Sequence, residues 1–212
     1  MSRYPIIISV MFSALLLSAC VDIKQTYKQT EFYTLEYQPP DPGTRKQLPF
    51  SIRVERFVTA PDLNSGRIIY RSGPYKRDAY VYHRWRSNPA ETVRYLLSRD
   101  LSASGLFSAV FTGARNLSSS IAIEGVIDEF YEWDNGLDTE AVISVSVMVL
   151  ADQKDSQERV IVLQERFTSR QPCAERSAPA LVTALSKAMS EVSNNLTNRI
   201  YEELLKANVN GQ

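Results

Sequence analysis

The chain has 212 residues, and its 24 Lys and Arg side chains equal its 24 Asp and Glu side chains in number, with a single His. A balanced charge gives no overall basic field of the kind that nucleic-acid-binding proteins use, so we expect no nucleic-acid partner. The length is ordinary for one folded domain with a substantial hydrophobic core.

The N-terminal segment predicts export. Arg3 precedes an apolar run over residues 6–17. A helix that spans a bilayer needs about 20 apolar residues, so this run is too short, and a positive start before a short apolar stretch is typical of a secretory signal. The run ends in Leu-Ser-Ala-Cys, with Cys20 last, which resembles the lipobox of bacterial lipoproteins. In those proteins the Cys is lipidated and the signal is removed before it. An ordinary cleaved signal beside a chance Cys is the alternative.

The predicted lipidation site divides the chain. Residues 1–19 form a signal peptide, residues 20–29 hold the lipidated Cys20 and a flexible tether, residues 30–207 form one domain, and residues 208–212 form a tail. Two or more acyl chains anchor a protein stably without a spanning helix. Position 21 is Val rather than Asp. By resemblance to Gram-negative lipoproteins, this predicts lipid anchoring at the periplasmic face of the outer membrane.

Short apolar-alternating segments predict four strands in the first part of the domain. They cover residues 32–37, 52–57, 67–71 and 79–83. We expect the third and fourth strands to form a hairpin, and residues 60–63 to form a turn. A helix follows, because Asn88 suits its cap, Pro89 its first position and Glu91 its positive end, and Gly105 suits its C-terminal stop.

The clearest β region lies in the second half, after a short buried strand at about residues 106–111. Asn135-Gly136 is a strong hairpin signal between two alternating apolar segments. Three strands of a long meander are therefore predicted, over about residues 121–133, 143–150 and 159–168. Apolar residues then recur every three or four positions in a long C-terminal helix over about residues 178–207. The predicted fold class is α+β, with a mainly antiparallel sheet and a long β-meander, covered on one face by the mid-chain and the C-terminal helix.

The side chains that catalysis or metal binding would need are few. A Ser-His-Asp triad would have to use His83, and no G-x-S-x-G elbow supplies its Ser. Five carboxylates gather between Asp128 and Asp138 and could form a paired-acid site or a calcium loop, but they lack the spacing of a calcium loop and a solvated strand end is the favoured interpretation. Cys173 is the only cysteine besides Cys20, and an incidental thiol is favoured over a reactive or bridging one. We therefore predict no enzyme, no metal site and no cofactor.

One segment combines basic and aromatic side chains. Residues 67–86 hold six Lys or Arg residues against Asp78 alone, interleaved with Tyr and Trp. Such a combination suits anionic lipid headgroups or a protein partner, although two amphipathic strands that face water would look the same. The candidate surface residues are Arg71, Tyr75, Lys76, Arg77, Tyr80, Tyr82, Arg84 and Trp85.

The order of motifs in the first half resembles the ABC-type transport auxiliary lipoproteins, the family that includes paraquat-inducible protein C. The matching segments are FYTL at 32–35, APDL at 60–63, RIIYR at 67–71, YVYHRW at 80–85 and NP at 88–89. Arg86-Ser87 departs from the smaller or acidic residues expected after the Trp.

The resemblance implies a non-catalytic component of a system that moves lipids or other hydrophobic molecules between two membranes. The partners it implies are an MCE-domain protein with its permease and ATPase, and the chain would dock the MCE-domain protein at the outer membrane. Whether several copies of the chain assemble into a homo-oligomeric ring stays open. The alternative is an independent periplasmic lipid carrier, which needs an apolar cavity lined by Ile127, Val145 and the final helix.

Overall fold

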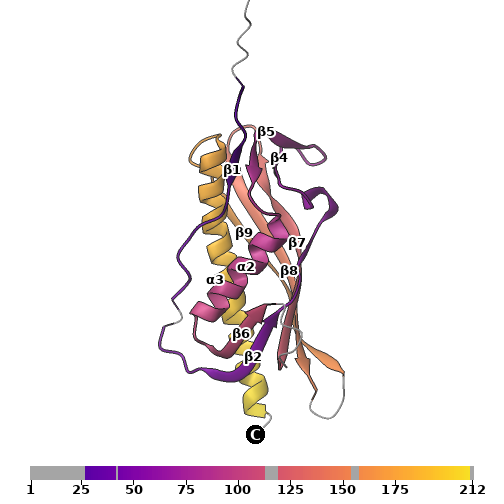
Figure 1. Cartoon of the computed structure of the whole chain (residues 1–212), viewed down its shortest axis with the longest axis vertical. Coiled ribbons are helices and arrows are strands. Elements are labelled where there is room, and N and C mark those ends of the chain that lie inside the picture. The colour runs from indigo at the N-terminus through magenta and orange to yellow at the C-terminus, as the bar shows by residue number, and fades with distance from the viewer. Residues whose placement is uncertain (1–26, 42, 113–118, 154–157, 211–212) are drawn as a thin grey trace, which may run out of the picture.

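A computed structural model of the chain describes residues 27–41, 43–112, 119–153 and 158–210 (Figure 1). The predicted signal peptide, Cys20 and most of the predicted tether lie outside the described residues.

The predicted long meander is present, and its first strand pairs with more strands of the sheet than any other strand does. It consists of β7 (Ile121–Asp134), β8 (Thr139–Asp152) and β9 (Arg159–Pro172), each 14 residues long and paired antiparallel with its neighbour. Gly136 adopts a positive φ of 92° in the β7–β8 turn, where its backbone N–H donates to Asp134 Oδ1 at 2.8 Å. Asp128 is an extra residue in β7, because Ile127 lies opposite Val145 and Phe130 lies opposite Ile143. This bulge keeps Ile127 and Phe130 on the same face of the sheet, although they are three positions apart.

The remaining strands make the sheet mixed, so the predicted mainly antiparallel sheet is wrong. Three strands, β2 (Leu48–Val54), β3 (Val58–Thr59) and β4 (Arg67–Arg71), each pair parallel with a different part of β7. Local alternation predicts strands but carries no information about partners that lie far away in sequence, and the hairpin signals favoured antiparallel neighbours.

Two further parallel pairs widen the sheet. They join β1 (Glu31–Tyr33) to β5 (Arg77–Trp85), and β2 to β6 (Phe107–Thr112). The predicted hairpin of β4 and β5 is confirmed, and the short helix η1 (Pro61–Leu63) occupies the predicted turn. The first strand is shorter than predicted. It ends at Tyr33, and Leu35 lies in the core outside the strand.

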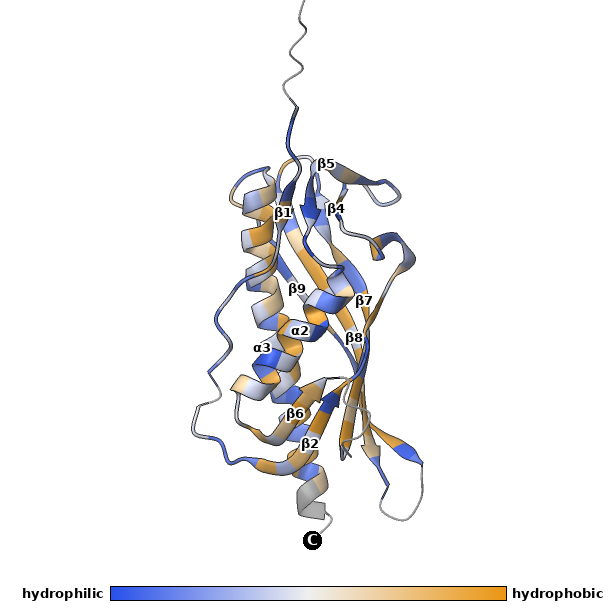
Figure 2. Cartoon of the chain, in the orientation of Figure 1, coloured by the Kyte–Doolittle hydropathy of each residue, from blue (hydrophilic) through white to orange (hydrophobic). Residues whose placement is uncertain are grey.

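Two helices cover the concave face of the sheet. Helix α2 (Pro89–Ala103) begins at Asn88, whose side chain accepts a hydrogen bond from the backbone of Ala90 at 2.9 Å. Helix α3 (Ala178–Asn210) has 33 residues. Its inward side chains, such as Leu185 and Leu196, have no exposed surface, and burial of each such side chain contributes about 1.5–3 kcal/mol. Figure 2 shows the hydrophobic residues running along β7, β8 and α3.

A buried carboxylate links the two helices. Asp100 of α2 is 1% exposed, and its Oδ2 accepts hydrogen bonds from Tyr37 at 2.7 Å and from Ser193 of α3 at 2.6 Å. Arg99 donates to the other oxygen at 2.8 Å and lies over the ring of Tyr37. Because both oxygens of Asp100 accept hydrogen bonds, this network fixes the packing of α2 on α3.

The molecule is elongated along α3, whose 33 residues span about 50 Å at a rise of about 1.5 Å per residue. Tyr27, the β4–β5 turn, the β7–β8 turn and the first turn of α3 lie at one end, which we call the tether end (Figure 1). The C-terminal part of α3 lies at the other end, as do the last residue of β8, Asp152, and the first residue of β9, Arg159, which pair with each other. The chain therefore enters the domain at one tip of a long body.

Candidate functional site

Strand alternation divides the predicted basic and aromatic segment between two faces. Trp85 points inward, is 6% exposed and packs edge-to-face on Phe130 at 5.2 Å. Its predicted place on a partner surface is therefore wrong, because its position in β5 directs the ring into the core. Trp85 supports the strand from beneath.

Arg71 lies on the convex face and makes several contacts within the domain. Its guanidinium donates to Tyr131 Oη at 2.7 Å and to the Pro74 carbonyl at 2.8 Å, and it lies 4.9 Å above the rings of both Tyr131 and Trp133. Glu129 Oε1 lies 3.9 Å from Arg71 Nη1. These contacts hold the β4–β5 turn against β7, so Arg71 acts as a structural support.

Tyr80 belongs to a polar cluster on the concave face. Its hydroxyl donates to Glu132 Oε2 at 2.7 Å, and Glu132 is only 4% exposed. Burial raises the pKa of Glu132, and burial followed by the bond to Glu132 raises the pKa of Tyr80. The ring of His83 packs edge-on against Tyr80, and its Nδ1 lies 3.3 Å from Glu31 Oε2. The polar partners of His83 within the described residues are Tyr33 and Glu31, and no Ser or Cys side chain hydrogen-bonds to it there.

The carboxylates predicted to form a solvated strand end occupy different environments. Asp128 accepts from Ser146 at 2.6 Å and pairs with Arg166, while Asp134 pairs with Arg176 at 2.9 Å. Glu132 is the exception that the sequence analysis missed. Glu132 lies two positions after Phe130 and so shares its face of the strand, and this spacing could have predicted that Glu132 is buried. No group of three or more His, Cys, Asp or Glu side chains could hold a metal ion within the described part of the chain.

Cys173 is half-buried against the core, and burial raises the pKa of its thiol. A raised pKa lowers the thiolate fraction and with it the reactivity. This environment favours the predicted incidental role.

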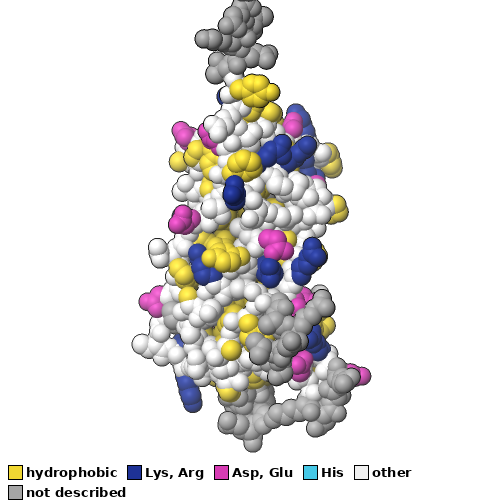
Figure 3. Space-filling model, in the orientation of Figure 1, with side chains coloured by type: hydrophobic (Ala, Val, Ile, Leu, Met, Phe, Trp, Pro, Cys, Tyr) yellow, Lys and Arg dark blue, Asp and Glu magenta, His cyan; other side chains and the backbone are white. Residues whose placement is uncertain are grey.

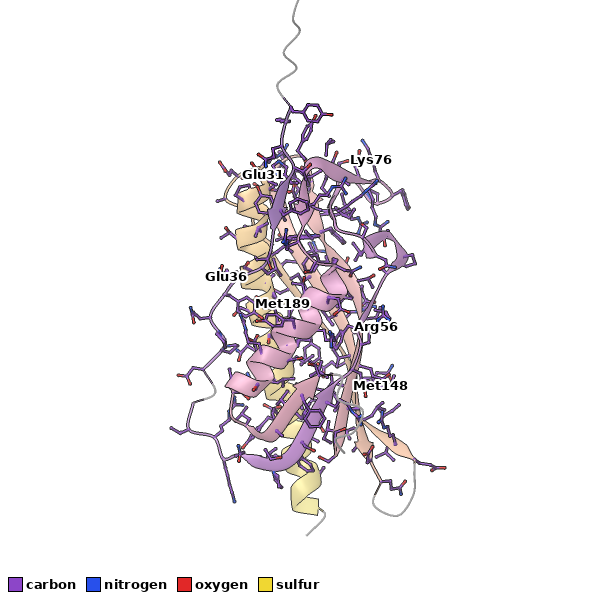
Figure 4. All side chains as sticks on the ribbon, in the orientation of Figure 1. Glu31, Glu36, Arg56, Lys76, Met148 and Met189 are labelled. Atoms are coloured by element: carbon purple, nitrogen blue, oxygen red, sulfur yellow. The ribbon has the colours of Figure 1, made fainter. Side chains whose placement is uncertain are left out.

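The exposed members of the predicted segment lie at the tether end. Tyr75 is 96% exposed in the β4–β5 turn beside Lys76, which Figure 4 labels, and Arg77 pairs with Asp62 at 2.6 Å. Figure 3 shows basic side chains next to hydrophobic ones at this end of the molecule.

Tyr82 and Arg84 belong to a surface that includes residues outside the predicted segment. We call it the tether patch, and it consists of Lys28, Phe32, Tyr82, Arg84 and Arg86. In the parallel pair of β1 and β5, Phe32 lies opposite Arg84. The Arg86 guanidinium lies 5.9 Å over the ring of Phe32, and Lys28 Nζ lies 5.1 Å over the ring of Tyr82. The sequence analysis missed Lys28 and Phe32, because only the β1–β5 pairing brings them to this place.

A second surface feature lies midway along the meander on the convex face. This convex groove has a volume of about 480 Å³ and is lined by the exposed side chains of Val58 and Val126, by Met148, and by charged side chains of both signs, Arg56, Glu124, Glu165 and Arg166. Figure 4 labels Arg56 and Met148 on this side of the molecule. Apolar side chains together with polar and charged ones are typical of protein interfaces.

The cavity that a lipid carrier would need does not form around the predicted residues. Ile127 and Val145 both have 0% exposure, and so has Leu185 of α3. A side chain without accessible surface does not border a space that admits even a water-sized probe. These residues are part of the packed core.

Within the described residues, no helix combines the length and the apolar character needed to cross a membrane.

Comparison with known proteins gives a family match and a fold match. The family described as the ABC-type transport auxiliary lipoprotein component matches residues 33–197. A solved structure from Xanthomonas campestris has a TM-score of 0.74 at 17% identity, covering 84% of this chain and 99% of that one. An uncharacterized protein of known structure has a TM-score of 0.63 at 14% identity, covering 81% and 99%. At these identities the two structures show the fold alone. No curated protein matches the sequence.

Proposed function

Because the chain belongs to the family of ABC-type transport auxiliary lipoprotein components, we propose that it is the non-catalytic outer-membrane lipoprotein of an MCE/ABC-type system that moves lipids or other hydrophobic molecules between two membranes. In this role it docks an MCE-domain protein, which works with a permease and an ATPase. The observation that carries the proposal is the family match, which extends from the end of β1 to within α3.

The shape of the domain supports a docking role. A lipid on Cys20 and the short tether to Tyr27 would hold the tether end near the bilayer, and α3 would then reach about 50 Å outward. Anchoring in this way raises the local concentration of the domain for a partner at the same membrane without any additional contact.

The convex groove is the surface we propose for the MCE-domain protein. Val58 and Val126 are 53% and 38% exposed there, and Met148, Arg56 and Arg166 line the same groove. The groove lies clear of the tether end, so a membrane and a protein partner could be contacted at once. Apolar side chains exposed in a groove lose water when a partner covers them, which favours association.

The experiment that tests the proposal is affinity capture from gently solubilised native membranes. A tag follows Gln212, and the matched control carries Cys20→Ala. We expect the tagged chain to recover an MCE-domain protein with its permease and ATPase, and the control to recover less because it is not concentrated at the membrane. Recovery of the chain alone would contradict the proposal, and recovery of the chain with bound lipid would favour the carrier.

A further inference from the structure

We infer that the tether patch is a contact surface for the anionic phospholipid headgroups of the membrane that anchors the chain. The inference rests on the proposed lipidation of Cys20. It adds a second attachment to the docking role, one that determines how the domain is oriented on the bilayer.

The chemistry of the patch matches a lipid headgroup layer. Lys28, Arg84 and Arg86 form no ion pair with a carboxylate among the described residues, and Phe32 and Tyr82 are 56% and 40% exposed. Cations attract the phosphates of anionic lipids, and aromatic rings partition to the level of the headgroups. The two cation–ring contacts hold these groups on one outward face.

Alternation along the two strands keeps acidic and core residues off this face. His83 and Trp85 lie on the opposite side of β5 from Tyr82 and Arg84, and Glu31 pairs with His83 there. Elsewhere at the tether end, Asp134 is neutralised by its ion pair with Arg176. The three cations of the patch are therefore free to meet an external anion.

The position of the patch places it within reach of the bilayer. Eight peptide units separate Cys20 from Lys28 in the sequence, and a fully extended chain covers at most about 3.5 Å per residue, or roughly 28 Å. A lipidated Cys20 would thus keep the patch at a high effective concentration of headgroups. The long axis of α3 would point away from the membrane when the patch is in contact with it.

The test uses the lipidated chain reconstituted in phosphatidylethanolamine and phosphatidylglycerol vesicles that contain a headgroup spin-labelled lipid. In a Cys173→Ser background, one fluorophore is attached to Val81→Cys, where the side chain is 71% exposed in β5, and another to Leu205→Cys, where it is 41% exposed. Leu205 lies about 40 Å along α3 from the start of the helix. We expect strong quenching at position 81 and none at position 205.

Charge removal then tests the patch itself. Lys28→Gln, Arg84→Gln and Arg86→Gln together should lower the ratio of membrane-contacting to free domains roughly a hundredfold, which is about fivefold for each cation. The matched control removes the same charge from exposed lysines elsewhere in the described chain. Its substitutions are Lys46→Gln, Lys187→Gln and Lys206→Gln. The control should keep the quenching at position 81, while phosphatidylcholine vesicles should abolish it for the wild-type chain.

Three results would overturn the inference. Equal quenching at positions 81 and 205 would show that the domain has no fixed orientation. Undiminished quenching in the patch variant would show that the cations do not contact lipid, and if that variant also lost capture of the transporter, the patch would bind protein. A mature chain whose mass shows no acyl groups on Cys20 would overturn the lipid anchor together with this inference. If the anchor is intact but the tether patch does not contact the membrane, only this inference fails and the proposed docking function still stands.

Discussion

Gly125→Ala should destabilise the domain, because the space above Gly125 is already occupied. A Cβ at this position would lie 2.3 Å from Cε1 and 2.7 Å from Cδ1 of Phe57, whereas carbon atoms in contact are about 3.5–4.0 Å apart. Phe57 is 1% exposed, so its ring has no solvent to move into. Ala gains up to about 1 kcal/mol over Gly through chain entropy, but overpacking costs about 1–3 kcal/mol or more.

The steric cost should dominate, giving a net loss of about 1–2 kcal/mol in the free energy of unfolding. For a domain of this size that lowers Tm by roughly 2–8 °C, which urea unfolding and thermal melts followed by circular dichroism would measure. Gly73→Ala is the matched control, because a Cβ there meets nothing within 4 Å and the expected change is within about 0.5 kcal/mol. Phe57→Leu should cost less in the Gly125→Ala background than in the wild type, since it removes the overlap. A Gly125→Ala protein as stable as the Gly73→Ala control would refute the reasoning.

Three further predictions concern the buried polar groups and the groove. Asp100→Ala should cost roughly 3 kcal/mol in urea unfolding, because it leaves the buried hydroxyls bonded to Asp100 without an acceptor, and a loss below about 1 kcal/mol would contradict the role given to this network. Burial raises the pKa of Glu132 above its ordinary 4.5, so the folded state holds this proton more tightly than the unfolded chain, and the free energy of unfolding falls as pH rises from 4.5 through the folded pKa. Glu132→Gln should remove that fall and should be the more stable protein at neutral pH. A free energy of unfolding that depends more steeply on pH in the variant would contradict this. Met148→Glu in the convex groove should reduce capture of the transporter at least about tenfold, while Val160→Glu, on an exposed part of β9 outside the groove, should leave it unchanged, and equal capture by both variants would exclude the groove.

The elements that local physics determines were predictable from the sequence. The capped start of α2 at Asn88, the Asn135-Gly136 turn and the amphipathic pattern of α3 each depend on side chains within a few positions of one another. The three long strands were predicted from the alternation of apolar and polar residues along their sequences. Sequence reasoning therefore reached the α+β class and the meander.

The parallel pairings and the tether patch could not be reached in that way. The pairing of β2, β3 and β4 with β7 depends on contacts between segments far apart in the chain, for which the sequence carries no local signal. The same holds for Phe32 and Arg84, which meet only through the β1–β5 pair. Trp85 was misplaced because an aromatic residue beside several arginines fits a surface and a core position equally well until the phase of the strand is known.

The central claim is that this chain docks its partner at the outer membrane, and membrane fractionation tests it most directly. Native membranes are separated on a density gradient after mild crosslinking, with the wild-type chain and with Val21→Asp, a change that by resemblance to other lipoproteins favours retention in the inner membrane. We predict that the wild-type chain and a crosslinked MCE-domain protein are found together in the outer-membrane fraction, and that Val21→Asp removes the MCE-domain protein from that fraction. A wild-type chain found in the inner-membrane fraction, or found in the outer membrane without any crosslinked transporter component, would contradict the claim.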